Sequence, residues 1–179
     1  FDLIVHRLRA GVAIHFVLAD FDPHLATDLH RGTWRSVRQF CAARETAAPC
    51  RLDLLPVRHA AHAGIGPRTL FWPLILRRVS RMLGREDPAW FDLAVGMRGH
   101  LRERPDGRLG VAPRPVPRIY PATPHQKLAV FDRRKLFMGG LDLDERRYDD
   151  PDHRRAGHQT WQDVSVIAGG ACASGASAS

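Results

Sequence analysis

The chain has 179 residues, of which 44% are hydrophobic and 26% charged, so it is long enough and apolar enough for one globular domain with a core. Its 27 Lys and Arg outnumber its 19 Asp and Glu, and the net charge of +8 favours anionic partners such as phospholipid head groups, nucleic acid or a phosphodiester. Three cysteines fit neither a disulfide framework nor a zinc site, and the longest apolar run, residues 70–76, is too short to cross a bilayer.

The first third of the chain predicts a β-α-β unit. Arg9-Ala10-Gly11 is typical of a helix end, and the nearly continuous apolar run over residues 12–18 predicts a buried strand. Apolar residues at steps of mostly three or four predict a helix over residues 25–44, and residues 52–57 predict a second strand. Because a helix joins the two strands, we expect them to pair in parallel.

Residues 67–84 combine apolar side chains with arginines and are interrupted by Pro73. The pattern favours an amphipathic helix packed on a sheet, since every helix of an α/β domain needs one apolar face. The alternative is an interfacial helix that places Phe71, Trp72 and Leu76 in lipid and its arginines among the head groups.

Residues 84–118 show little periodicity and are rich in Gly, Pro and Arg. They predict a long excursion with a packed turn near residues 90–95. Because the excursion precedes the strongest motif of the chain, it is either a loop that faces the substrate or an inserted connection without a chemical role.

That motif lies within residues 124–149 and has the spacing H-x-K-x4-D-x6-G-G, formed by His125, Lys127, Asp132, Gly139 and Gly140. On a strand, a two-residue separation puts the first two side chains on one face, so an imidazole and an ammonium can reach the same phosphate. From the composition, the five fixed positions co-occur by chance on the order of 10^-4 times.

The same segment predicts a β-hairpin, with strands over residues 128–131 and 136–138. Asp132 lies at the predicted tip, where we expect its carboxylate to accept backbone N–H groups of the turn. Gly139 and Gly140 close the return strand, and their missing side chains leave room for a phosphate to approach the backbone.

The remainder of the chain predicts three further segments. Residues 141–150 are typical of a helix start or a turn, whose N–H groups would add to anion binding. The run from Thr160 to Ile167, which opens with T-W-Q-D-V, predicts a last strand. Residues 169–179 form a tail of small residues, which we expect to be disordered.

The motif resembles that of the HKD phosphodiesterases, the phospholipase D superfamily. The sequences G-G-L-D-L, R-x-Y-D and T-W-x-D resemble the first-motif half of the lipid-type enzymes, although Gln162 stands where those commonly have histidine. The resemblance implies an α/β fold with a mixed sheet flanked by helices on both faces. Residues 1–168 would form a single phospholipase D-like lobe, incomplete at its N-terminus and lacking the second lobe. We therefore expect a fragment of a longer protein.

The resemblance also implies how the site works. His125 would attack phosphorus and form a phosphohistidine, while Lys127 neutralises the non-bridging oxygens. Asp163 would accept a hydrogen bond from the histidine and hold its tautomer. No metal or cofactor is implied. A second H-x-K lobe would be needed, from a missing C-terminal half or from a second chain.

We expect a phospholipase D-like hydrolase or phosphatidyltransferase of lipid metabolism, cytoplasmic or peripheral to a membrane. The chain alone is expected to be inactive. One alternative is an endonuclease of the HKD type that acts as a homodimer. Another is a basic half-domain that binds phosphate or membrane without turnover.

Overall fold

The computed structural model describes residues 1–112, 115–140, 152, 154–159 and 164–170. Internal contacts divide the chain into two units, Phe1–Pro124 and His125–Ser179. Helices and strands both contribute, as expected for an α/β protein, but the strands of the described residues form three small separate sheets. One mixed sheet with helices on both faces is therefore not what the described residues contain.

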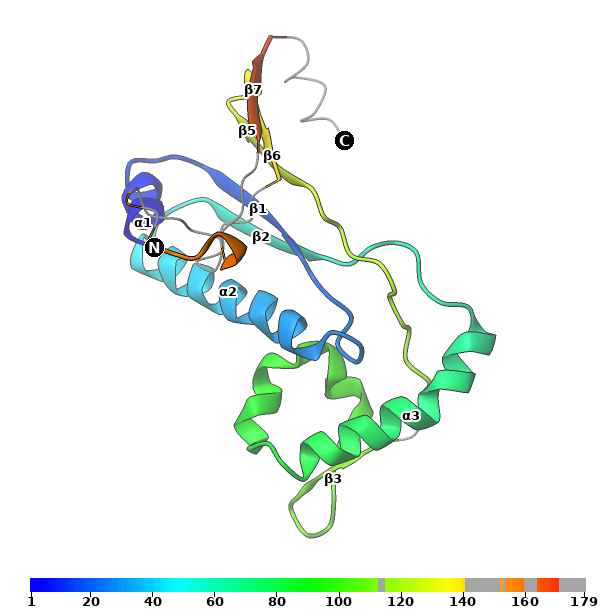
Figure 1. The fold of residues 1–179 in the computed structure, drawn as a ribbon. Helices are drawn as coiled ribbons and strands as arrows, with labels where there is room; N and C mark the ends of the chain where they lie inside the picture. Colours follow the sequence, from blue (N-terminus) through cyan, green and yellow to red (C-terminus); the bar gives the residue numbers. More distant parts are fainter. Residues whose placement is uncertain (113–114, 141–151, 153, 160–163, 171–179) are drawn as a thin grey trace. The chain divides into compact units, whose positions relative to one another are not determined.

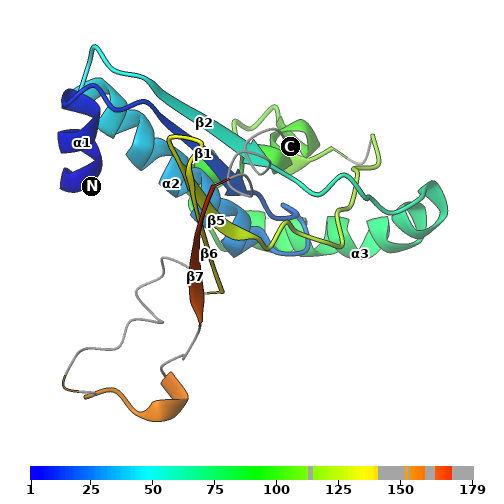
Figure 2. The same cartoon turned by 90° about the horizontal axis from the view of Figure 1, so that it is seen from above.

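The first unit begins with the predicted β-α-β arrangement. Helix α1 (Asp2–Arg9) precedes β1 (Ile14–Ala19), and α2 (Thr27–Thr46) joins it to β2 (Leu52–Val57). The strands pair in parallel, which confirms the prediction. Gly11 turns the chain between α1 and β1 with a φ of 82°, a conformation that favours glycine. Both views of the ribbon place α2 alongside β1 and β2 (Figures 1 and 2).

Among the described residues of the first unit, packing covers one face of the β1–β2 sheet. The core on this face is formed by residues of α1, of α2 and its C-terminal cap, and of β2. They are Val5, Leu8, Ala43, Ala47 and Leu52. On the other face Val17 and Leu55 are neighbours in register, and they are 69% and 59% exposed. The prediction of a buried strand therefore holds for the face that packs on the helices and is wrong for the other face within the first unit, because the apolar run is continuous while the packing of α1 and α2 is one-sided.

Helix α3 (Ile65–Leu83) packs on a second core. This core combines its inner face with two 3-10 turns, η1 (Pro88–Leu93) and η2 (Val95–His100), and consists of Trp72, Ile75, Val79, Phe91, Ala94, Met97 and Ile119. Pro73 does not interrupt the helix. It lies on the exposed side, where water can hydrate the carbonyl that its missing N–H leaves free.

The predicted excursion is more ordered than its sequence suggests. Besides η1 and η2 it contains a short antiparallel hairpin, β3 (Leu101–Glu103) and β4 (Leu109–Val111). The packed turn expected near residues 90–95 is present in η1, with Phe91 buried. None of the helices in the described ranges combines the length and the apolar content that crossing a bilayer requires.

The second unit is built on an antiparallel sheet of order β5–β6–β7, with β5 (Lys127–Phe131), β6 (Lys135–Gly139) and β7 (Ser165–Gly169). The predicted hairpin is thus confirmed. The last strand predicted over residues 160–167 is present from Ser165 onward, and residues 160–163 lie outside the described residues. A single 3-10 turn, η4 (Gly157–Gln159), precedes β7. The helix start predicted over 141–150 and most of the predicted tail lie outside the described residues.

The β5–β6 turn holds two residues in the left-handed region, Asp132 with a φ of 50° and Arg133 with a φ of 56°. The N–H of Arg134 closes the turn on the carbonyl of Phe131 at 2.9 Å. Aspartate tolerates this conformation, whereas arginine is strained in it. Arg133→Gly is expected to stabilise the hairpin by about 1 kcal/mol and to slow amide exchange of β5 and β6 about fivefold.

The matched control is Arg134→Gly, because Arg134 belongs to the same turn but not to its left-handed pair. There glycine relieves no strain and only adds freedom to the unfolded chain, so exchange should quicken. If exchange quickens in Arg133→Gly as well, the turn does not strain that residue.

Candidate active site

The histidine and lysine of the motif meet at the start of β5. Lys127 Nζ lies 2.8 Å from His125 Nε2 and 3.3 Å from the carbonyl oxygen of the same residue. An ammonium has only donors, so Nε2 must accept and therefore carries its lone pair. His125 is exposed and Lys127 half-buried, so the pair faces solvent. A ring nitrogen that bears a lone pair thus lies beside an ammonium group, from which it accepts a hydrogen bond.

The register of the sheet brings a further side chain to the face of Lys127. Lys127 pairs with Gly139, and Gly139 pairs with Ser165, so the three residues share one face. A Cβ on Gly139 would lie 2.5 Å from Ser165 Oγ, which explains why no side chain fits there. The side chain of Ser165 therefore fills the space above Gly139, where the sequence had predicted room for a phosphate, and brings a hydroxyl to this face. Gly140 follows directly after β6.

Sequence reasoning missed Ser165, because a serine in a strand carries no signal until the register of its neighbours is known. The register shows it beside Gly139, on the face that the motif lysine uses. A hydroxyl in this place can donate to a phosphate oxygen. The face therefore offers an ammonium and a hydroxyl, and the imidazole of His125 lies 2.8 Å from the ammonium.

Asp132 lies at the tip of the hairpin, as predicted. It is separated from Lys127 by the length of β5, roughly 13 Å at about 3.3 Å per residue. Within the described residues its carboxylate accepts no hydrogen bond, so the expected capping of turn N–H groups is not seen there. Its role rests on its backbone, which adopts the left-handed conformation of the turn. Asp163 lies outside the described residues.

A buried polar network occupies the ends of β1 and β2 in the first unit. Asp20 follows β1 and is 3% exposed, and its carboxylate lies 2.6 Å from His30 Nδ1 and accepts from Arg58 Nε at 2.8 Å. His30 Nε2 in turn accepts the N–H of Gly96 at 3.0 Å, so the proton of this ring is on Nδ1. Burial raises the pKa of Asp20, but the hydrogen bonds and charges of His30 and Arg58 outweigh it and lower that pKa.

Asp22 extends the network across the sequence. One carboxylate oxygen accepts the N–H groups of His24 and Leu25, both at 2.8 Å, and the other accepts the N–H of Tyr120 at 2.7 Å. The contact ties residues 98 positions apart. Asp20 thus holds two side chains and Asp22 holds three backbone N–H groups, so both carboxylates serve to fix the structure. The signal in the sequence is the D-F-D-P run of residues 20–23, which places two carboxylates directly after an apolar strand.

His24 is a buried base whose ring nitrogens form no hydrogen bond among the described residues, although Nδ1 lies 3.8 Å from Asp22 Oδ1. It is 2% exposed, and its ring packs edge-on against Trp72 and His100. Burial is the main reason that the pKa of His24 is lowered to about 4; Asp22 opposes the shift, and His100, His30 and Arg58 add to it. Burial also lowers the pKa of His100.

Acid is therefore expected to destabilise the first unit. The unfolded chain binds a proton on His24 near pH 6.5 and the folded chain near pH 4, so the free energy of unfolding falls as the pH falls through that window. The loss from this residue is up to about 3 kcal/mol.

Urea unfolding at pH 7 and pH 4.5 measures this loss, and His24→Phe should reduce the difference in unfolding free energy between the two pH values. His15→Gln, at an exposed histidine, should leave it unchanged; an equal slope in His24→Phe and the parent would contradict the assignment.

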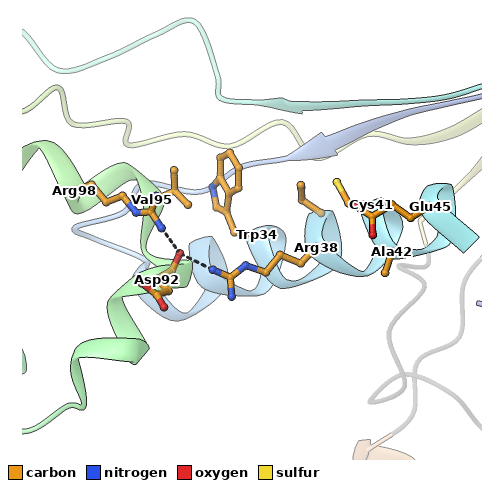
Figure 3. A pocket seen from close by; sticks show the side chains of 9 residues that line it. Trp34, Arg38, Cys41, Ala42, Glu45, Asp92, Val95 and Arg98 are labelled. Carbon is orange, nitrogen blue, oxygen red and sulfur yellow. Dashed lines mark hydrogen bonds between the residues drawn. The ribbon is translucent and has the colours of Figure 1, made fainter.

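A cavity of about 390 Å³ lies between α2 and the η1–η2 segment, and Figure 3 shows it. Its lining consists of Trp34, Val37, Arg38, Cys41, Ala42, Glu45, Asp92, Val95 and Arg98. Both Arg38 and Arg98 donate to the carbonyl oxygen of Asp92, each at 3.1 Å (Figure 3). Since these guanidinium groups already hold the turns against α2, the cavity is a seam of the fold and contains none of the motif residues.

In the part of the chain that the structure describes, no group of His, Cys, Asp and Glu is arranged to hold a metal ion. The strongest chemical feature of the described residues is therefore the face of β5–β6–β7 that carries Lys127 and Ser165. No family model matches the chain, and neither the curated proteins nor the solved structures provide a match to it.

Proposed function

We propose that this chain is a lobe of a phospholipase D-type phosphodiesterase, which hydrolyses or transfers the head-group ester of a phospholipid at a membrane surface. The observation that carries the proposal is the 2.8 Å contact between Lys127 Nζ and His125 Nε2. It joins the two residues that the motif pairs and places Nε2 as the acceptor of the Lys127 ammonium, the role from which a nucleophile acts. We further propose that the small sheets belong to the mixed sheet of a phospholipase D-like lobe.

In this scheme Nε2 of His125 attacks phosphorus, so a P–N bond forms as the P–O bond to the head group breaks. Lys127 moves its hydrogen bond from Nε2 to the non-bridging oxygens, whose charge it balances. The hydroxyl of Ser165 can donate to the same oxygens. Asp163 would accept a hydrogen bond from Nδ1–H and so keep the ring in the reactive tautomer. Water or an alcohol then attacks phosphorus and regenerates the imidazole.

The leaving alkoxide needs a proton, and we assign its donor to a second H-x-K motif. The chain has one such motif and two lysines, Lys127 and Lys135, and Lys135 lies at the far end of β6 from Gly139. The second motif would come from further polypeptide or from a second copy of this chain. Activity that rises with the square of protein concentration would identify the second copy.

The test uses the protein that contains this chain, in EDTA, with vesicles of phosphatidylcholine and ethanol as a second acceptor. Choline release, phosphatidylethanol formation and a phosphatidyl adduct on the peptide of His125 after acid-free quenching are the expected results. Cleavage of plasmid DNA without lipid turnover would replace the proposal with the homodimeric nuclease, which the single motif and the net charge of +8 also suit. Binding of vesicles without either reaction would support the alternative of a half-domain that binds phosphate or membrane without turnover.

A further inference from the structure

Helix α3 has two apolar faces, and the core uses only one of them. Its inner face holds Trp72, Ile75 and Val79, all buried, with Leu76 packed against them. Apolar residues also lie on the side of α3 that faces away from this core. Four of their side chains are more than half exposed: Ile65 65%, Leu70 74%, Phe71 51% and Leu74 62%. These four are called the outer apolar patch here. Packing within the first unit does not account for it.

The same outer side becomes cationic toward the end of the helix. Arg77, Arg78 and Arg81 are exposed, and residues 65–83 include no Asp or Glu. Among the described residues none of the three arginines forms an ion pair with a carboxylate. Arg78 and Arg81 also line a cavity of about 340 Å³, together with Thr27, Asp28, Met82, Arg85, Glu86 and Trp90. The outer side of α3 is thus apolar over its first half and positive over its second.

We propose that this outer side docks on the surface of an anionic phospholipid bilayer. Leu70 and Leu74 are one helical turn apart and share a face, so they can enter the boundary between head groups and acyl chains together. Arg77 and Arg81 continue the same face and would lie at the level of the lipid phosphates. Leu76 and Trp72, which the sequence-based alternative placed in lipid, belong to the inner face instead.

Charge decides between a bilayer and other occupants. A second copy of the chain would bring its own arginines against Arg77 and Arg81, and a net charge of +8 opposes such contacts. Nucleic acid would use the arginines and leave the leucines in water. A bilayer with acidic lipids accommodates the leucines at its apolar boundary and the arginines at its phosphates. The proposal deepens the proposed function by naming how the lobe meets its lipid, but its observations do not depend on the motif.

The first test measures binding to vesicles by co-sedimentation, with the full protein in a His125→Ala background so that no turnover intervenes. Vesicles of phosphatidylcholine with phosphatidylserine should bind more tightly than phosphatidylcholine alone. Leu70→Ser with Leu74→Ser should weaken binding at least about tenfold. The control is Leu3→Ser, because Leu3 is 67% exposed on α1 and should not matter. Unchanged binding by the double variant overturns the proposal.

The second test separates local charge from total charge. Arg77→Gln with Arg81→Gln should weaken binding to the acidic vesicles about fivefold per arginine. Arg7→Gln with Arg44→Gln removes the same charge from exposed sites on α1 and α2 and should weaken it far less. Equal losses in both pairs would overturn docking through α3. Sedimentation velocity without vesicles measures whether the protein dimerises. A dimer that is lost in the Leu70→Ser and Leu74→Ser double variant would show that a second copy of the chain covers the outer side of α3.

Discussion

His125→Ala is expected to lower head-group release by at least about 1,000-fold, with no change in the stability of the fold. The reason is that Nε2 of this ring carries the lone pair beside the Lys127 ammonium, and no other described side chain offers such a pair on that face. His125 is exposed, so its removal leaves no buried cavity. Steady-state release of choline by the protein that contains this chain is the measurement.

The chain offers matched controls for both members of the pair. His158→Ala removes another exposed histidine of the same unit, on η4, and should keep full activity. Lys127→Gln and Lys135→Gln change the only two lysines, which lie on the neighbouring strands β5 and β6. The first should abolish turnover and the second should not. If His125→Ala retains the parent rate while Lys135→Gln loses it, the assigned nucleophile is wrong.

Local patterns made much of the fold predictable. The β-α-β start and the motif hairpin were both predicted from apolar spacing and turn residues, and both are present. The face shared by His125 and Lys127 followed from the two-residue period of a strand, and the 2.8 Å contact agrees with it. These features depend on residues that are close in sequence, where a single chain carries the information.

The remainder depended on distant contacts. The bonds of His30 to Gly96 and of Asp22 to Tyr120 join loops that no periodicity relates, and Ser165 gained its place only through strand register. The exposed face of β1–β2 was also missed, because apolar content shows that a strand can be buried but not how many sides are covered. Pro73 was overestimated as a break, since its cost depends on whether it faces solvent or a neighbour.

Asp20→Ala is expected to lower the free energy of unfolding by about 4 kcal/mol. Asp20 is the shared partner of His30 and Arg58, and all of its contacts lie where the carboxylate is 3% exposed. Removing it leaves the Nδ1–H of a fully buried histidine unpaired and takes the counter-charge from a partly buried guanidinium. The control is Asp53→Ala, whose pair with His15 is mostly exposed on both sides, so the change should stay within about 0.5 kcal/mol.

The variants of Asp20 also separate charge from hydrogen bonding. Asn at this position keeps an acceptor for His30 Nδ1 but gives up the negative charge that faces Arg58, so Asp20→Asn should lie between the parent and Asp20→Ala. Adding Arg58→Leu to Asp20→Asn removes the stranded cation and should recover part of the loss, whereas the same addition to the parent should cost stability. Urea unfolding at pH 7 measures the four members of this cycle, which are the parent, Asp20→Asn, Arg58→Leu and the double variant. If the change in unfolding free energy of the double variant equals the sum of the two single changes, Asp20 acts through His30 alone. The network would then hold the loop after β1 by one hydrogen bond and not by charge.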